Sequence, residues 1–175
     1  MFQPGDLIVY GNSGVCRVES IGTPESAVGD KDAQYYTLSP LYSSETIYTP
    51  VDTGVFMRPI ISREEAQEFV EQIAFAEATV FEKQNLSLLK EQYNAVLKTH
   101  DCENLLCLVK SVYEKNADAQ QRGKKLSQMD QQYWKRAEEL LHGELAAALD
   151  IPMERIADYI ADAVQAAAPS AQTDE

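Results

Sequence analysis

The chain has few of the side chains from which catalytic and metal sites are usually built. Its 175 residues include two histidines, His100 and His142, and neither lies in a motif with a serine or cysteine nucleophile. The three cysteines, Cys16, Cys102 and Cys107, are odd in number and lack the Cys-x-x-Cys spacing of zinc and redox sites. The sequence therefore predicts a protein that is not an enzyme and that holds no metal and no cofactor.

Long apolar runs and an excess of positive charge are also absent. No apolar run reaches the length of a membrane span, and the opening residues lack the basic and apolar regions of a signal peptide, so we expect a soluble, cytoplasmic protein without a membrane role. Lys and Arg number 15 against 28 Asp and Glu, which gives a net charge of −13. Because nucleic-acid binders normally show a local or global positive excess, any DNA contact must be local and assisted by a partner.

What the sequence does contain is a β-rich beginning. Leu7–Tyr10 and Val15–Ile21 are rich in β-branched and aromatic residues and flank a Gly-Asn-Ser-Gly turn, which is typical of a hairpin. Further strands are expected over Gln34–Tyr42, Glu45–Val51 and Val55–Ile60. Five short strands in about sixty residues predict either a strongly bent sheet or a small SH3/Tudor-like β-barrel.

From Ser62 onward the apolar residues recur at helical spacing, which predicts an all-helical domain of about five helices. Ser62 and Glu65 form a capping box at its start. Later helices are expected to begin near Leu86, Asp101, Ser127 and Pro152. The predicted fold class is therefore α+β, with a barrel at 1–61, a helical domain at 62–166 and a disordered tail at 167–175.

Several segments match, in the same order, the motifs of one known family. In the β-rich part they are Phe2–Val15, Tyr35–Leu38, Tyr48–Val51 and Met57–Ile61, and in the helical part they are Leu126–Ser127, Trp134–Leu141 and Gly143–Ala146. The sequence thus resembles the CarD/CdnL family of bacterial transcription regulators, over about residues 1 to 149.

The resemblance implies that the barrel docks edge-on against the β subunit of RNA polymerase. Strand addition suits this task, because an exposed edge offers unpaired N–H and C=O groups. The expected polymerase-binding residues are Glu45, Thr46, Ile47, Tyr48 and Thr49, together with Tyr36. Family members can carry arginines near the positions of Pro24 and Tyr48, and this sequence has neither, so the contact would depend on other side chains.

The resemblance also implies that the helical domain contacts promoter DNA, and does so only within the polymerase complex. In the family a tryptophan near the start of the second helix wedges into the minor groove beside basic residues. Leu86 stands about where that tryptophan is expected, and it is either a wedge or an ordinary core leucine. The expected DNA-binding residues are Leu86, Lys115, Lys124, Lys125, Lys135 and Arg136. The basic ones form either a phosphate-binding patch or a solvated face paired with nearby glutamates.

Two aromatic features also allow two interpretations. The sole tryptophan, Trp134, is either an exposed DNA-reading residue or a packing residue between helices. The tyrosines of the barrel are either an aromatic cage for a methylated cation or half-buried barrel and interface residues. Taken together, the sequence predicts a monomeric transcription regulator that binds the polymerase β subunit and modulates open-complex stability. The alternative is a protein-interaction adaptor without direct DNA contact.

Overall fold

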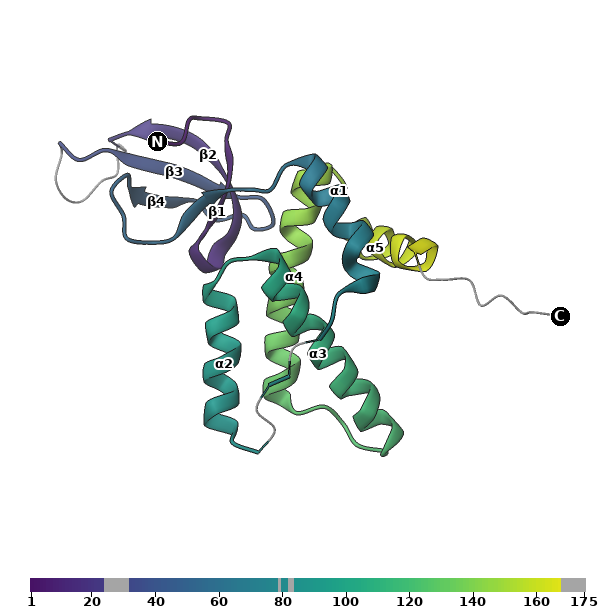
Figure 1. Ribbon diagram of the computed structural model, residues 1–175. Helices are drawn as coiled ribbons and strands as arrows, with labels where there is room; N and C mark the ends of the chain where they lie inside the picture. The colour runs from purple at the N-terminus through teal and green to yellow at the C-terminus, as the bar shows by residue number, and fades with distance from the viewer. Residues whose placement is uncertain (24–31, 79, 82–83, 168–175) are drawn as a thin grey trace. The chain divides into compact units, whose positions relative to one another are not determined.

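The computed structural model describes residues 1–23, 32–78, 80–81 and 84–167. The chain divides into two compact units, Met1–Ile60 and Ile61–Glu175. The first is built from strands and the second from helices, so the predicted α+β class is confirmed (Figure 1). Pro24 lies outside the described residues, as does the predicted tail at 167–175 except for Ala167.

The first unit is a five-stranded antiparallel sheet with the strand order β4-β3-β2-β1-β5. The strands are β1 (Leu7–Tyr10), β2 (Gly14–Gly22), β3 (Tyr35–Pro40), β4 (Ile47–Pro50) and β5 (Met57–Pro59). A closed barrel requires the two outermost strands to pair with each other. The described residues of β4 and β5 form no such ladder, and these strands have only four and three residues. The expected SH3/Tudor-like barrel is therefore not closed, and the sheet has two edges.

A tight turn links the first two strands to the segment before β5. The turn is the 3-10 helix η1 (Gly11–Ser13), and Gly11 has a φ of +43°, in the region that disfavours side chains. The Gly11 amide donates to the Phe56 carbonyl at 2.8 Å, and a Cβ on Gly11 would lie 2.9 Å from Val55 Cγ1. A side chain at this position would be strained by the backbone conformation and would require Val55 to shift.

One face of the sheet is buried. Its core consists of Ile8, Cys16, Val18, Tyr36 and Leu38. Buried and partly exposed residues alternate along β3, whereas on the opposite face the cross-strand pair Val9 and Val15 is buried as well. The burial of Cys16, with a smaller contribution from the charge of Glu45, raises the pKa of its thiol to about 11, so the thiol is protonated at neutral pH.

The second unit consists of five α-helices and one 3-10 helix in its described part. They are α1 (Arg63–Gln72), η2 (Ile73–Phe75), α2 (Leu86–Lys98), α3 (Cys102–Gln121), α4 (Gln128–Leu149) and α5 (Met153–Ala167). The predicted capping box of Ser62 and Glu65 is present at the start of α1. The side chains of Asn85, Asp101 and Ser127 accept first-turn amides of α2, α3 and α4. None of the described helices is long and apolar enough to cross a membrane.

The helices α2, α3 and α4 run in alternating directions (Figure 1). The start of α2, the end of α3 and the start of α4 therefore lie at the same end of the helical unit, which we call the α2–α4 end. The most extensive contact within the unit is between α3 and α4, and apolar side chains of α1, α2 and α5 complete its core.

Trp134 belongs to this core and is not an exposed residue. It is partly buried on α4 and packs against the core, with its ring edge-on to Tyr113 at 6.4 Å. Its indole N–H is buried and has no hydrogen-bond partner within the described residues. The structure thus supports the packing interpretation of Trp134.

Candidate functional site

Strand β4 lies at one edge of the sheet, within the segment predicted to bind polymerase. Ile47, Tyr48 and Thr49 pair with β3 on one side and, among the described strands, have no neighbour on the other. Glu45 and Thr46 precede the strand and are exposed. An edge of this kind keeps part of its backbone donors and acceptors available to an added strand.

The side chains predicted to bind polymerase divide between the two faces of the sheet. Tyr36 and Thr49 pair in register and are 3 % and 2 % exposed. The Tyr36 hydroxyl accepts the Phe2 amide at 3.2 Å, and the Tyr10 hydroxyl donates to Thr49 Oγ1 at 3.1 Å. These hydrogen bonds stabilise the sheet interior. Tyr48 lies on the other face, is 51 % exposed, and is the aromatic side chain of β4 that a partner could contact.

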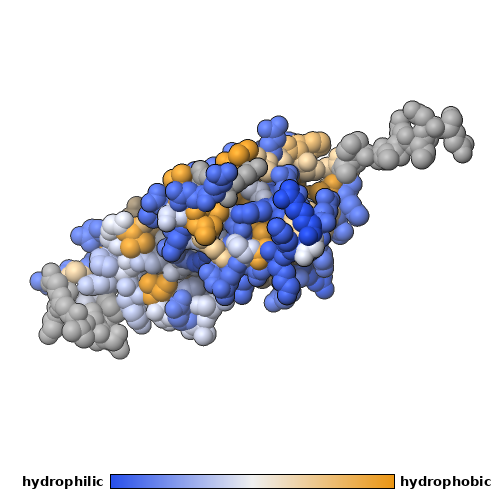
Figure 2. All heavy atoms as spheres, turned by 90° about the horizontal axis from the view of Figure 1, so that it is seen from below, coloured by the Kyte–Doolittle hydropathy of each residue, from blue (hydrophilic) through white to orange (hydrophobic). Residues whose placement is uncertain are grey.

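Leu86 and two of the predicted lysines lie at the α2–α4 end. Leu86 is the first residue of α2 and is 68 % exposed, so it is not a core leucine. Leu88 is also exposed on the same helix turn. Lys124 and Lys125 are exposed in the segment between α3 and α4 and form no ion pair with any described carboxylate. Figure 2, a view from below Figure 1, shows separate apolar patches among hydrophilic side chains on the surface.

The direction of the helices places partial charges at this end. Each helix N-terminus carries a partial positive charge that favours phosphate. Both α2 and α4 begin at the α2–α4 end (Figure 1), but α3 ends there with the opposite partial charge, and the first turn of α4 already contains the Asp130 carboxylate. An exposed leucine, two lysines and two helix N-termini thus lie together in a chain that is otherwise strongly acidic.

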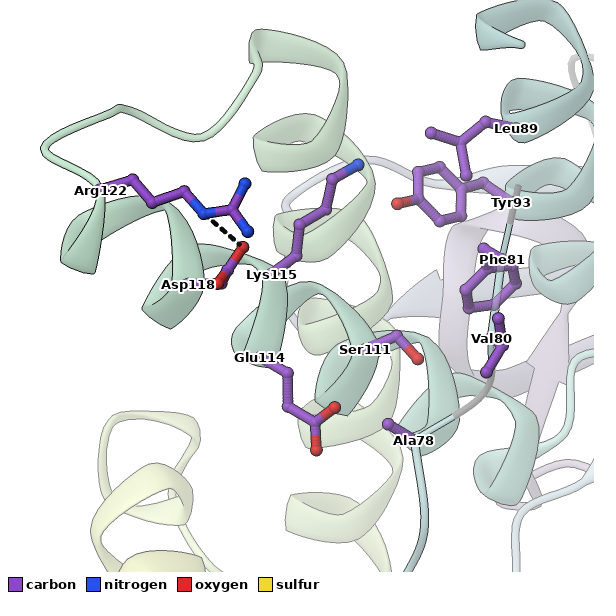
Figure 3. Close-up of a pocket in the computed structure, with 10 residues that line it drawn as sticks. All are labelled: Ala78, Val80, Phe81, Leu89, Tyr93, Ser111, Glu114, Lys115, Asp118 and Arg122. Atoms are coloured by element: carbon purple, nitrogen blue, oxygen red, sulfur yellow. Dashed lines mark ion pairs between the residues drawn. The ribbon is translucent and has the colours of Figure 1, made fainter. Parts of the chain in front are cut away.

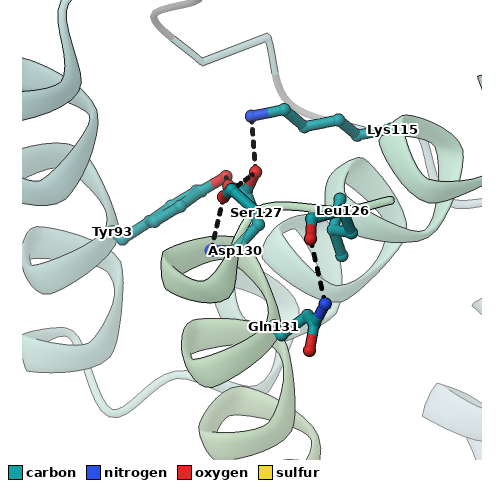
Figure 4. A network of polar contacts seen from close by, with 6 residues as sticks. All are labelled: Tyr93, Lys115, Leu126, Ser127, Asp130 and Gln131. Carbon is teal, nitrogen blue, oxygen red and sulfur yellow. Dashed lines mark hydrogen bonds and ion pairs between the residues drawn. The ribbon is translucent and has the colours of Figure 1, made fainter. Parts of the chain in front are cut away.

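Lys115, in contrast, forms an ion pair with a buried acid of the helical unit (Figure 4). Its Nζ lies 2.8 Å from Oδ2 of Asp130, whose side chain is only 2 % exposed. The same carboxylate accepts the Tyr93 hydroxyl at 2.7 Å and the Ser127 hydroxyl at 2.8 Å. Lys115 therefore neutralises a buried acid, and a phosphate would have to compete with that carboxylate for its charge.

The pKa values of this network follow from its contacts. Burial alone would raise the pKa of the Asp130 carboxyl, but the hydrogen bonds from Lys115, Tyr93 and Ser127 and the charge of Lys115 hold it below its ordinary value of 3.8. Burial raises the pKa of Tyr93 well above 10, and the hydrogen bond to Asp130 adds to this effect. At neutral pH the network thus contains a charged acid, a charged lysine and a neutral phenol.

A pocket of about 570 Å³ lies beside this network, between α2, α3 and the residues preceding α2 (Figure 3). Its apolar wall includes Phe81 and Leu89, and its charged wall includes Lys115 and Arg122. Lys115 is paired with Asp130, and Arg122 Nε lies 3.5 Å from Asp118. Because both cations are already paired, the pocket is a poor site for a phosphate.

Lys135 and Arg136 do not join the α2–α4 end. They lie about two turns into α4. Lys135 is exposed, and Arg136 is 3.7 Å from Glu139 on the next turn. The predicted DNA-binding residues therefore separate into three groups, of which the set Leu86, Lys124 and Lys125 has both exposure and a common location. No group of three or more His, Cys, Asp or Glu side chains among the described residues is placed to hold a metal ion.

The N-terminal unit is the part of the chain that matches a known family. Residues 2–61 match the family model of the CarD-like/TRCF RID domain. The N-terminal unit belongs to the CarD-like family. Domains of this CarD-like type interact with the β subunit of RNA polymerase and are not an enzyme family, which supports a polymerase-interacting role related to transcription. No curated protein matches the chain.

Proposed function

We propose that this chain is a transcription regulator that docks on the β subunit of RNA polymerase through β4 and contacts promoter DNA through the α2–α4 end. The observation that carries the proposal is an open β4 edge in a CarD-like domain. Backbone groups along such an edge pair with a partner strand and need no specialised side chains. This explains how docking is possible although the arginines expected near Pro24 and Tyr48 are missing.

The second part of the proposal concerns the DNA. Leu86 is exposed at the start of α2, where an apolar side chain can enter between base steps, and Lys124 and Lys125 are available for the adjacent phosphates. Their effect is to stabilise the open promoter complex. The contact takes place only in the polymerase complex, because a net charge of −13 opposes binding of the free protein to DNA.

The alternative is an adaptor that binds polymerase without touching DNA. It is favoured by one observation: Lys115, a predicted DNA contact, is paired with the buried Asp130. In this alternative, Lys124 and Lys125 are ordinary solvated side chains that bind no phosphate.

The docking mode is tested by proline substitution at two consecutive residues of β4, Ile47→Pro and Tyr48→Pro. Backbone N–H groups of an antiparallel edge strand point alternately to the neighbouring strand and away from the sheet. Proline at one position therefore removes a bond to β3 and lowers the melting temperature. At the other position it leaves the sheet folded and removes a donor that the polymerase strand needs.

The controls are Ile47→Ala and Tyr48→Ala, which remove the same side chains but keep the backbone donors. We expect the folded proline variant to lose binding to purified β subunit in a pull-down while its alanine counterpart keeps it. Equal retention of β subunit by the folded proline variant and its alanine control would refute strand addition.

A further inference from the structure

The helical unit has a groove on which all the charged lining residues are acidic. It lies between α1, η2 and the first half of α3 and has a volume of about 570 Å³. We call it the acidic groove. Its apolar lining includes Phe69, Phe75 and Leu106, and its charged lining consists of Glu65, Glu68, Asp101 and Glu103.

The apolar part of the groove is open to a partner. Leu106 is 7 % exposed, and Phe69 is partly buried beside it. Phe75 is 62 % exposed, an unusual state for a phenylalanine in a folded chain. An occupant that covered this ring would remove a large apolar area from water, which is the main driving force of association.

The walls of the groove are held in place by its own contacts. Lys110 on α3 donates from Nζ to the carbonyl of Ala76 at 2.7 Å, which fastens the end of η2 to α3. Glu65 accepts the Ser62 amide at 2.8 Å, and Asp101 accepts the Glu103 amide at 3.3 Å. Two of the four carboxylates are therefore fixed at helix starts, and the groove does not need to be assembled on binding.

The acidic lining of the groove favours an occupant that carries positive charge. The four carboxylates are all on exposed residues, and Glu68 and Glu103 form no ion pair with any described cation. Nucleic acid and anionic lipid are repelled by such a rim. A second copy of this chain is disfavoured by its net charge of −13, and the residues after Ala167, which include Asp174 and Glu175, carry the wrong charge as well.

We propose that the acidic groove binds a segment of another protein in which large apolar side chains are flanked by Lys or Arg. The apolar side chains of that segment cover Phe75 and Leu106, and its cations face Glu68 and Glu103. A basic amphipathic helix has this pattern. The groove shares no residue with β4 or with the α2–α4 end. The chain would therefore join a second protein partner to polymerase, and the proposal does not depend on the DNA contact.

The test uses a fluorescein-labelled peptide of about 14 residues in which Leu at helical spacing i, i+3, i+4 and i+7 alternates with Lys. Fluorescence anisotropy at about 0.15 M salt measures its binding to the full chain, so that general attraction to an acidic protein is largely screened. We expect saturable binding that weakens at least about tenfold with Phe75→Asp and with the double variant Glu68→Lys/Glu103→Lys.

Matched variants separate the groove from general charge. Glu19→Lys/Glu154→Lys makes the same change in net charge at exposed residues outside the groove, and Val80→Asp changes another exposed apolar residue. Both should bind the peptide as the natural chain does. Circular dichroism checks folding, and Phe75→Ala replaces Phe75→Asp if the aspartate variant does not fold.

Three results would overturn the proposal: no saturable binding, equal loss of affinity in the groove and control variants, or equal binding of a peptide with Glu in place of Lys. Amide chemical shifts provide an independent readout. The peptide should shift resonances of α1, η2 and the first half of α3, and shifts confined to other elements would also overturn it.

Discussion

At the scale of single residues, Lys115 shows how a partly exposed cation can neutralise a buried carboxylate. Its ammonium group is the charged partner of Asp130, whose side chain is almost completely buried. Removing one member of such a pair leaves a buried charge without its counter-charge, which is more costly than losing a surface ion pair. Lys115 is itself 45 % exposed, so water compensates part of the loss.

We therefore predict that Lys115→Met lowers the free energy of unfolding by about 1–3 kcal/mol. Urea denaturation followed by circular dichroism measures the change. Lys124→Met is the matched control, because Lys124 has no described carboxylate partner and should change stability by less than about 0.5 kcal/mol. Equal stability of the two variants would mean that the ion pair to Asp130 contributes little.

Asp130 also makes the stability of the helical unit depend on pH. Its pKa in the folded protein lies below 3.8, so its contribution to stability is fully present above that pH and is lost as pH falls through the lowered folded value. The difference in stability between the natural chain and Asp130→Asn should accordingly be constant from about pH 5 to 7 and should shrink below about pH 4. Urea titrations of both proteins across this range test it. A difference that persists unchanged at pH 3 would contradict the role of the charged carboxylate.

At the scale of elements, the helix starts could be predicted because their signals are local. Ser62, Asp101 and Ser127 each precede an apolar helical pattern and cap the helix that follows. Helix ends were harder to predict than helix starts. The polar run from Asn116 to Lys125 indicates a connection between helices, but α3 continues to Gln121 before Gly123. Polar residues without Gly or Pro are compatible with a solvated helix end, and the local sequence does not distinguish the two states.

The closure of the sheet could not be predicted in the same way. Each strand has a local pattern, and all five were expected close to their observed positions. Whether β4 and β5 pair with each other depends on how far the sheet bends and on how long those strands are. The few residues of the two strands do not determine either property. The open edge at β4 was nevertheless expected, because the family resemblance implies edge-on docking through the segment that contains this strand.

The candidate site was predictable in its residue types but not in their surroundings. The apolar pattern allowed Leu86 to be either core or exposed, and the fold decides the matter by placing it on the first turn of α2. Lys115 and its partner Asp130 are 15 residues apart on different helices, so no local spacing links them. The acidic groove likewise combines α1 with α3 and has no continuous sequence signal.

At the scale of the whole molecule, net charge determines when DNA can be bound. A chain with 28 acidic and 15 basic residues repels the phosphate backbone, and two lysines cannot offset this in free solution. In the function proposed here, docking on polymerase would change the balance, because the tethered α2–α4 end would then meet promoter DNA at a high effective concentration. A few weak contacts would be sufficient under those conditions.

We predict the effect of three substitutions on the lifetime of the open promoter complex, measured with polymerase and the full-length variants. Lys124→Glu should shorten the lifetime, whereas Lys98→Glu, the same charge change at the opposite end of α2, should not. Leu86→Trp should lengthen it, since a larger apolar wedge compensates better for lost base stacking, which costs a few kcal/mol per step. All three variants should bind the β subunit as the natural chain does, because none lies in the CarD-like domain. If Lys124→Glu and Leu86→Trp both leave the lifetime unchanged while β-subunit binding is intact, the chain is the adaptor that acts without touching DNA.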